Sequence, residues 1–389
     1  MDFHISEEQA MIRSSVSQLA SRYGLEYWRE KDRDHAFPEE LWAELAKAGW
    51  LGTIIPEQYG GAGLGILEMS MVIEAVTAAG AGSTVAQLFM MTPVFGALTI
   101  LRHGSEEQRT HYLPKLAAGE IDFSMALTEP DAGSDALATK TFARRRGDEY
   151  VISGQKVWIS GVERADGMLL VARTTPLDES PKRTFGLSLF LVDPHASGIT
   201  FQPLEKVGTH CVSSCMVYFD ELVVPSTSLI GEEGQGWKYL VDTLNSERVV
   251  TTAGCVATGD LAIKLAVEYA NNRVVFGQTI GKHQGLQFPL ARFKAEIEMA
   301  RLMNYKAAWL FDQHMPCATE ANMAKLVAAE AAFSACDQAM QTLGGYGFSN
   351  EYHIERLWRD VRLFRLAPIS QEMILNFVGQ HVLGLPRSY

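Results

Sequence analysis

Cysteine is scarce in this sequence, and the few cysteines form neither a disulfide pattern nor a metal-binding motif. The chain of 389 residues has five of them, an odd number that is widely scattered. Cys211 and Cys215 are the one close pair, and on a single strand they would stand about 13 Å apart, too far for a disulfide. CxxC and HExxH motifs are absent as well, so we expect no zinc site and no other metal.

Basic residues are also in deficit. Lys and Arg together number 34 against 46 Asp and Glu, which gives a net charge of -12. An acidic surface does not attract a polyanion, and this argues against a general nucleic-acid-binding protein. The balance is still compatible with a small anionic ligand that a local arginine or lysine holds.

Long apolar runs are the third feature that we do not find. No stretch approaches the roughly 18 apolar residues of a membrane span, so we expect none. Residues 1–4 lack the character of a secretory signal, and the expected compartment is the cytoplasm. What remains is the composition of an ordinary globular protein, with 47% hydrophobic and 21% charged residues. The length fits two or three domains.

Residues 1–120 carry the signals of a helical domain. Ser6 and Ser105 each begin a capping box, in which a hydroxyl residue is followed three positions later by glutamine. Pro38 is suited to open a further helix that ends near Gly49.

Residues 121–230 change to the period of strands. Short β-rich runs with turn residues between them predict a small antiparallel barrel or sandwich. The runs are 150–152, 168–172, 187–192 and 216–219.

Residues 231–389 return to the helical period. Three long helices are expected, over 236–272, 285–314 and 319–343, and the glycines at 344 and 345 stop the third. The order of elements therefore predicts an α+β protein in which a β domain lies between two helical domains.

Four segments hold residue types suited to binding, and two of them adjoin the β domain. Residues 125–135 lead from an apolar strand into a turn of small residues, whose free N–H groups are able to bind an anion. The alternative is a simple turn between domains. Trp158 and Ser160 stand at a strand end, where the indole is suited to stack on a flat cofactor and the hydroxyl to bond to it. The alternative is a core tryptophan.

The other two segments lie in the C-terminal part. Arg273 ends the first long helix, where it either binds a phosphate or complements the helix C-terminus. Residues 341–348 form a glycine-rich loop after a helix. Neither this loop nor residues 61–65 match the dinucleotide fingerprint, which leaves a strand and opens a helix, and no P-loop pattern occurs.

In their order and spacing, these segments make the chain similar to the acyl-CoA dehydrogenase family along essentially its whole length. The matching stretches are 6–9, 56–61, 128–135, 154–160, 273–277, Gln284, 343–348 and 359–360. The resemblance implies a helical domain, a small β domain and a C-terminal four-helix bundle. It also implies a homotetramer that is a dimer of dimers.

The resemblance further implies FAD, bound between the β domain and the helices. Residues expected beside the flavin and ribityl chain are Leu127, Thr128, Gly133, Ser134, Trp158 and Ser160, with Ser370 as a further FAD contact. Residues expected to reach the pyrophosphate and adenosine of FAD in a neighbouring subunit are Arg273, Phe276, Gln284, Gln341, Gly344 and Gly345. Residues expected near the CoA part of the substrate are Ser134, Asn245 and Arg248.

The position of the catalytic base departs from the common family pattern. Many members carry a glutamate in a Tyr-Glu-Gly-Thr stretch, and here Pro368 occupies that place. A minority, including the isovaleryl and long-chain branches, place the base in a Glu-Arg pair on a C-terminal helix. Glu247 and Arg248 match that pair, so the resemblance assigns Glu247 as the base.

Helix geometry supports this assignment independently. Glu247 shares a helical face with Leu240, Leu244, Thr251 and Gly254. A carboxylate on such a face is desolvated, which raises its pKa and makes it a better base near neutral pH. The alternative is a buried glutamate paired with an arginine.

The expected activity is the FAD-dependent dehydrogenation of an acyl-CoA to a trans-2-enoyl-CoA. Glu247 removes the α-proton, flavin N5 accepts the β-hydride, and an electron-transferring flavoprotein takes the electrons. The segment 365–373 also resembles crotonobetainyl-CoA reductases, so an enoyl-CoA reductase is the nearest alternative. A non-catalytic flavin or acyl-CoA binding protein and a flavin oxidase are the others. The small residues Thr251 and Gly254 leave room for an acyl chain whose identity the sequence does not fix.

Overall fold

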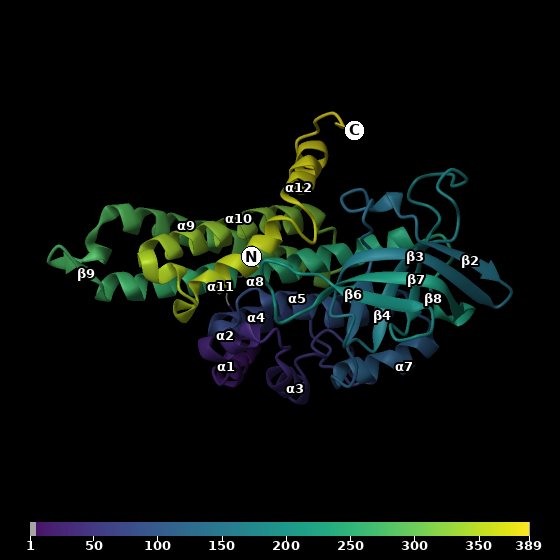
Figure 1. Cartoon of the computed structure of the whole chain (residues 1–389), viewed down its shortest axis with the longest axis horizontal. Coiled ribbons are helices and arrows are strands. Elements are labelled where there is room, and N and C mark those ends of the chain that lie inside the picture. Colours follow the sequence, from purple (N-terminus) through teal and green to yellow (C-terminus); the bar gives the residue numbers. More distant parts are fainter. Residues whose placement is uncertain (1–4, 389) are drawn as a thin grey trace.

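The computed structural model describes residues 5–388, and its first third is helical, as predicted (Figure 1). Ser6 and Ser105 form the predicted capping boxes: their hydroxyls accept hydrogen bonds from Gln9 N at 3.1 Å and Gln108 N at 3.2 Å. The third helix starts directly after Pro38. The helices are α1 Glu7–Ala20, α2 Leu25–Arg33, α3 Glu39–Lys47, α4 Ile66–Val76, α5 Thr84–Phe89, α6 Thr99–His103 and α7 Glu106–Ala117.

One eight-stranded sheet forms the middle of the chain, in the order β6-β7-β3-β2-β4-β5-β8 with β1 beside β4. Its strands are β1 Phe123–Ala126, β2 Phe142–Arg146, β3 Glu149–Ser160, β4 Gly167–Arg173, β5 Leu187–Val192, β6 Ile199–Pro203, β7 Ser214–Pro225 and β8 Leu229–Ile230. The pairings are antiparallel, as predicted, except that β4 runs parallel to β1 and, at one residue pair, to β2. The parallel pairing arises because the β2–β3 hairpin separates β1 from β4 in the chain.

The last third is a bundle of long helices, and the predicted bounds hold within two residues for all three of the longest. The helices are α8 Gly236–Asn272, α9 Gln284–Asp312, α10 Ala318–Leu343, α11 Ile354–Arg362 and α12 Gln371–Phe377. A short hairpin of β9 Val274–Val275 and β10 Gln278–Thr279 connects α8 to α9. Figure 1 shows this hairpin at the tip of the bundle, far from the β domain, and α12 projecting from its side.

Helix α8 is the central element, because residues of α4, α8 and α10 share one apolar core. The expectation that no apolar stretch approaches the length of a membrane span was wrong: Thr84–His103 and Gly236–Asn272 are long and apolar enough to cross a bilayer. However, 89% and 78% of their most apolar segments lie buried inside the protein. They are therefore core helices of the fold. The expectation about a secretory signal concerns residues 1–4, which lie outside the described residues.

All five cysteines are buried and free. Cys211 lies before β7, which begins at Ser214, so the assumption of a single strand for Cys211 and Cys215 was wrong. The close pair forms no disulfide in spite of that.

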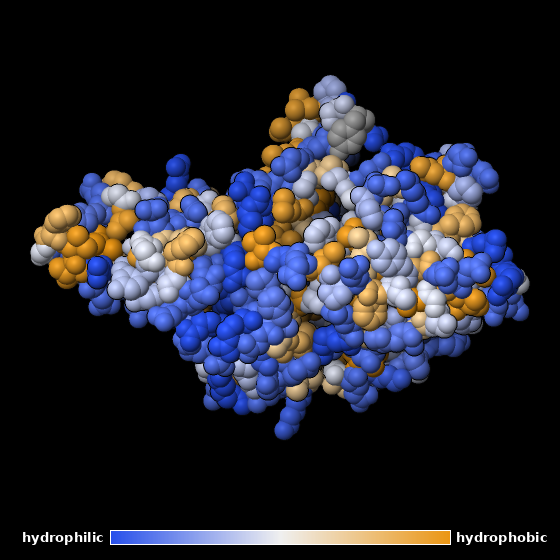
Figure 2. Space-filling model, viewed as in Figure 1, coloured by the Kyte–Doolittle hydropathy of each residue, from blue (hydrophilic) through white to orange (hydrophobic). Residues whose placement is uncertain are grey.

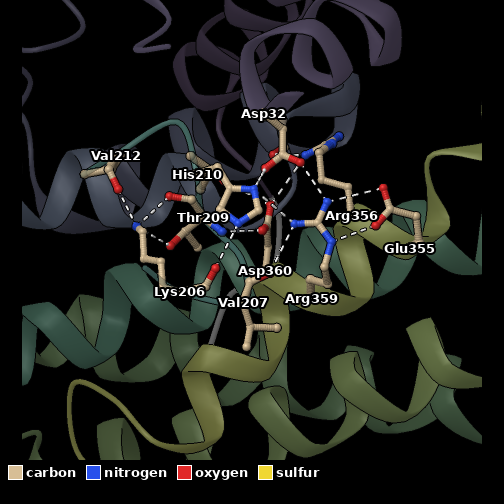
Figure 3. Close-up of polar contacts among 12 residues, drawn as sticks. Asp32, Lys206, Val207, Thr209, His210, Val212, Glu355, Arg356, Arg359 and Asp360 are labelled. Atoms are coloured by element: carbon tan, nitrogen blue, oxygen red, sulfur yellow. Dashed lines mark hydrogen bonds and ion pairs between the residues drawn. The ribbon is translucent and has the colours of Figure 1, made fainter. Parts of the chain in front are cut away.

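The Arg359-Asp360 pair holds the three parts of the chain together (Figure 3). Arg359 Nη2 on α11 donates to Asp32 Oδ2 on α2 at 2.7 Å. Asp360 Oδ1 accepts from Thr209 N, in the loop between β6 and β7, at 2.5 Å, and its Oδ2 accepts from Thr84 Oγ1 on α5 at 3.2 Å. This sequence motif thus fixes the β domain against both helical domains.

Candidate active site

Glu247 lies on α8 with a carboxylate that no neighbour holds. The residue is 3% exposed, and the predicted face around it is real: Leu240, Thr251 and Gly254 are buried, and Leu244 is half-buried. Within residues 5–388 the carboxylate accepts no hydrogen bond and forms no ion pair. A buried carboxylate without partners is costly, and such groups occur where a protein uses them in chemistry.

The arginine beside Glu247 is bound elsewhere. Arg248 Nη1 donates to Leu244 O at 2.7 Å and to Asn245 Oδ1 at 3.2 Å. The alternative of a glutamate neutralised by an arginine contact is therefore not what the structure contains. Arg248 and Asn245, both predicted near CoA, lie together and are half-buried.

Burial raises the pKa of Glu247 to about 7, against the opposing charges of Arg248 and Lys325. Lys325 lies fully buried on α10, and its Nζ donates to Ile369 O at 2.6 Å. Burial also lowers the pKa of Lys325 to about 8. The site thus holds a base whose two protonation states are both accessible near neutral pH.

Lys325 also fixes the segment in which Pro368 replaces the common family base. Its bond to Ile369 O ties this loop to α10. The next residue, Ser370, is the N-cap of α12, and its Oγ accepts from Met373 N at 3.4 Å. Sequence reasoning missed Lys325, although a lysine among the small residues of an otherwise buried helix face was a visible signal.

The segment after β1 forms the predicted turn. Glu129 and Ala132 exchange two backbone hydrogen bonds of 3.1 Å, which close a tight turn over Pro130 and Asp131. Leu127 and Thr128, before this turn, are half-buried. After it the two predicted ligand residues, Gly133 and Ser134, are exposed, and there is open space around Gly133.

A buried ion pair fixes this segment to β3. Lys156 Nζ donates to Glu129 Oε1 and to Leu127 O, both at 2.8 Å, and both side chains are almost fully buried. Glu129 also accepts from Lys140 N at 2.7 Å and Thr141 N at 2.9 Å. The sequence motifs at residues 128–135 and 154–160 therefore form one structural unit.

Trp158 is not a core residue. A bulge in β3 gives it a left-handed backbone with φ of 63°, and 57% of the residue is exposed. A left-handed conformation is strained for such a residue and is characteristic of binding sites. The strand therefore presents a large flat aromatic outward, which contradicts the alternative of a core tryptophan.

Ser160, at the end of β3, has a partner that sequence reasoning missed. Gln87 Nε2 on α5 donates to Ser160 Oγ at 3.0 Å. Gln87 is 4% exposed, although every other residue of its helix is apolar or threonine. A glutamine in so apolar a helix was the only available signal.

The second predicted group of cofactor residues lies at the tip of the bundle. Arg273, Gly344 and Gly345 line one pocket of about 630 Å³ together with Tyr269 and Tyr346. The structure thus brings these three predicted residues together around a space large enough for a ligand.

The remaining members of this group are exposed near the same tip. Phe276 is 98% exposed in the β9–β10 turn, where it and Gly277 both have positive φ, as in a type I′ hairpin. Figure 2 shows the apolar surface that results at this end. Gln284 and Gln341 are exposed at the start of α9 and the end of α10. Since the tip lies far from β3 in Figure 1, one chain presents the two groups at separate places.

The comparisons with known proteins cover nearly the whole chain. Family models for the N-terminal, middle and C-terminal domains of acyl-CoA dehydrogenases match residues 6–120, 124–222 and 234–383. Acyl-CoA dehydrogenase FadE12 of Mycobacterium tuberculosis is 41% identical over 99% of this chain and 98% of its own length.

Two solved structures share the fold. A glutaryl-coenzyme A dehydrogenase in complex with glutaryl-CoA is 32% identical, covers 100% of this chain and 98% of its own, and has a TM-score of 0.95. An FAD complex of PigA is 26% identical, covers 99% and 100%, and has a TM-score of 0.93.

The residues present also fit FAD. Trp158 offers an exposed aromatic face for a flat ring, and the exposed backbone at Gly133 has open space around it for a ligand. Arg273 lines the pocket at the bundle tip and offers a guanidinium for a phosphate. The chain therefore belongs to the acyl-CoA dehydrogenase family, and it is an FAD-dependent oxidoreductase.

Proposed function

We propose that this protein dehydrogenates an acyl-CoA between its α and β carbons, with Glu247 as the base that removes the α-proton. The observation that carries the proposal is the buried Glu247 carboxylate without a hydrogen-bond or ion-pair partner on α8. The product is a trans-2-enoyl-CoA.

Each residue has a defined part in this reaction. Glu247 takes the proton in its ionised form, and the charges of Arg248 and Lys325 oppose the effect of burial on that form. FAD, when bound, supplies the acceptor for the β-hydrogen. Lys156 and Glu129 hold the segment that would line the flavin. Asn245 and Arg248, which are hydrogen-bonded to each other, would contact the CoA part of the substrate.

The proposal includes the partners. Arg273 and Phe276 belong to the tip of the bundle around β9, at the opposite end of the molecule from β3, which carries Trp158 (Figure 1). We therefore assign them to the FAD of a neighbouring subunit in a tetramer. An electron-transferring flavoprotein accepts the electrons. The protein acts in the cytoplasm, where free thiols such as its five cysteines persist.

The experiment that tests the reaction is an anaerobic titration of the purified protein, followed by its visible spectrum. Saturated acyl-CoAs of increasing length and branching are added in turn. Bleaching of the flavin band by one class establishes dehydrogenation. If none bleaches the band, while the chemically reduced enzyme is reoxidised by enoyl-CoAs, the second candidate, an enoyl-CoA reductase, replaces the first. The pKa of Glu247 near 7 suits that candidate as well, because the protonated form that a reductase needs is also populated.

We expect flavin reduction by substrate to rise with pH, with a midpoint near pH 7 and a plateau about one pH unit higher, because only ionised Glu247 accepts a proton. Lys325→Met removes a positive charge that lowers the pKa of Glu247, so the midpoint moves to higher pH. Stopped-flow rates across pH measure both. Lys306→Met, which removes a 55% exposed lysine side chain, is the matched control. If the midpoint does not move in Lys325→Met, the charge of Lys325 does not lower the pKa of Glu247.

A further inference from the structure

Gln87 carries a buried polar atom that its own fold does not use. Its Nε2 is anchored on Ser160 Oγ at 3.0 Å. Its Oε1 has no hydrogen-bond partner among the described residues, although the side chain is buried. An unsatisfied buried amide oxygen destabilises the fold, so a hydrophobic residue would suit helix α5 better unless a ligand supplies the missing bond.

Thr251 shows the same feature on α8. The other buried hydroxyls of this helix all donate to carbonyls of the preceding turn: those of Thr243, Ser246, Thr252 and Thr258 do so at 2.6–2.9 Å. Thr251 is 1% exposed, and its Oγ1 has no partner in residues 5–388. Its neighbour Thr252 thus behaves as an ordinary helical threonine, whereas the hydroxyl of Thr251 remains available to bind a ligand.

The two unused groups lie on either side of one contact between helices. At Gly254 an added Cβ would be only 2.5 Å from Ala86 Cβ, so α5 and α8 touch there. Gln87 follows Ala86 directly. Thr251 stands one turn before Gly254, on the face that also carries Glu247 one turn earlier. The groups therefore border the region that runs from Glu247 along α8 towards α5.

We infer that Gln87 and Thr251 form a polar subsite beside the base, which binds an uncharged hydrogen-bonding group, a hydroxyl or an amide, on the acyl chain of the substrate. A hydroxyl is able to donate to Gln87 Oε1 and to accept from Thr251 Oγ1, which is the bond that each of these groups lacks. A charged group fits less well, because an amide and a hydroxyl do not neutralise a buried charge. The inference rests on the proposed function, since it places the acyl chain next to Glu247.

The experiment measures binding separately from turnover. FAD-loaded Glu247→Gln protein, which keeps the site but lacks the base, is titrated with pairs of acyl-CoAs of equal length. The members of a pair differ only by a hydroxyl beyond the β carbon, and the flavin difference spectrum reports the Kd. We expect about tenfold tighter binding of the hydroxylated member for at least one hydroxyl position, which corresponds to one or two net hydrogen bonds.

Two further substitutions in this background locate the effect. Thr251→Val removes a hydroxyl at constant shape, so the Kd ratio of the pair should fall to about one. Thr252→Val is the matched control, because its hydroxyl bonds to Arg248 O, and the ratio should stay near ten. Equal Kd values for every pair, or equal loss in both variants, would overturn the subsite. If the preference is found but the wild-type flavin is never bleached, the proposed reaction fails and the subsite stands.

Discussion

Replacing Glu247 by glutamine is expected to leave a folded, yellow protein whose flavin acyl-CoA no longer bleaches. General-base catalysis contributes about 10²–10⁴-fold, so we expect reduction to slow by about 10³-fold. The amide keeps the shape of the carboxylate and breaks no hydrogen bond, because Glu247 makes none within the described chain. Burial of a neutral group also costs less than burial of a charge, so stability should not decrease. Stopped-flow reduction and thermal unfolding measure the two effects.

The control for this substitution is the neighbouring carboxylate near the common family position. Glu372 is exposed, four residues after Pro368. Glu372→Gln should retain the wild-type rate of flavin reduction. If Glu372→Gln slowed the reaction and Glu247→Gln did not, the base would lie in the segment after α11. Pro368 would then not indicate that the base has moved to α8.

Elements with strong local signals could be predicted from the sequence. Helix α8 has the expected bounds, because its apolar pattern is continuous and Gly236 and Arg273 mark its ends. The strands β2 and β6 were not foreseen. Residues 144–146 are three exposed arginines, so β2 does not show the alternation that marks a half-buried strand. In β6 only Ile199 and Phe201 alternate with polar residues before Pro203, which is too short a run to mark a strand. Their pairing with β3 and β7 alone makes them strands.

The candidate site likewise has a part that the sequence predicts and a part that it does not. Glu247 and Trp158 belong to recognisable local motifs, and their residue types indicate their chemistry. The supporting contacts join residues that are far apart in the chain: Gln87 to Ser160 over 73 positions, and Lys325 to Ile369 over 44. No periodicity records such pairs, because tertiary packing alone brings them together. The bulge that turns Trp158 outward was likewise beyond prediction, because it is set by the pairing of β3 with β7.

The buried pair of Lys156 and Glu129 should give the largest effect on stability. Glu129→Gln leaves the ammonium of Lys156 in the interior without a counter-charge, and breaking such a pair costs about 3–5 kcal/mol. Burial already lowers the pKa of Lys156 to about 8 even beside Glu129, so the lone lysine loses its proton more readily still. Urea unfolding of the FAD-free protein measures the loss, and a titration with FAD should show weaker binding, because Leu127 O belongs to the same unit.

The second half of this experiment separates the ion pair from the loop that it holds. Asp131→Asn, in the same segment, breaks an ion pair to Lys140 whose side chains are 72% and 73% exposed, and it should cost less than about 1 kcal/mol. The double variant Lys156→Met with Glu129→Gln removes both charges, so it should be more stable than Glu129→Gln alone. Its FAD binding should stay weak, because Leu127 O and the N–H groups of Lys140 and Thr141 have lost their charged partners. Recovery of FAD binding together with stability would mean that the pair acts only on the core, and that the flavin segment keeps its shape without it.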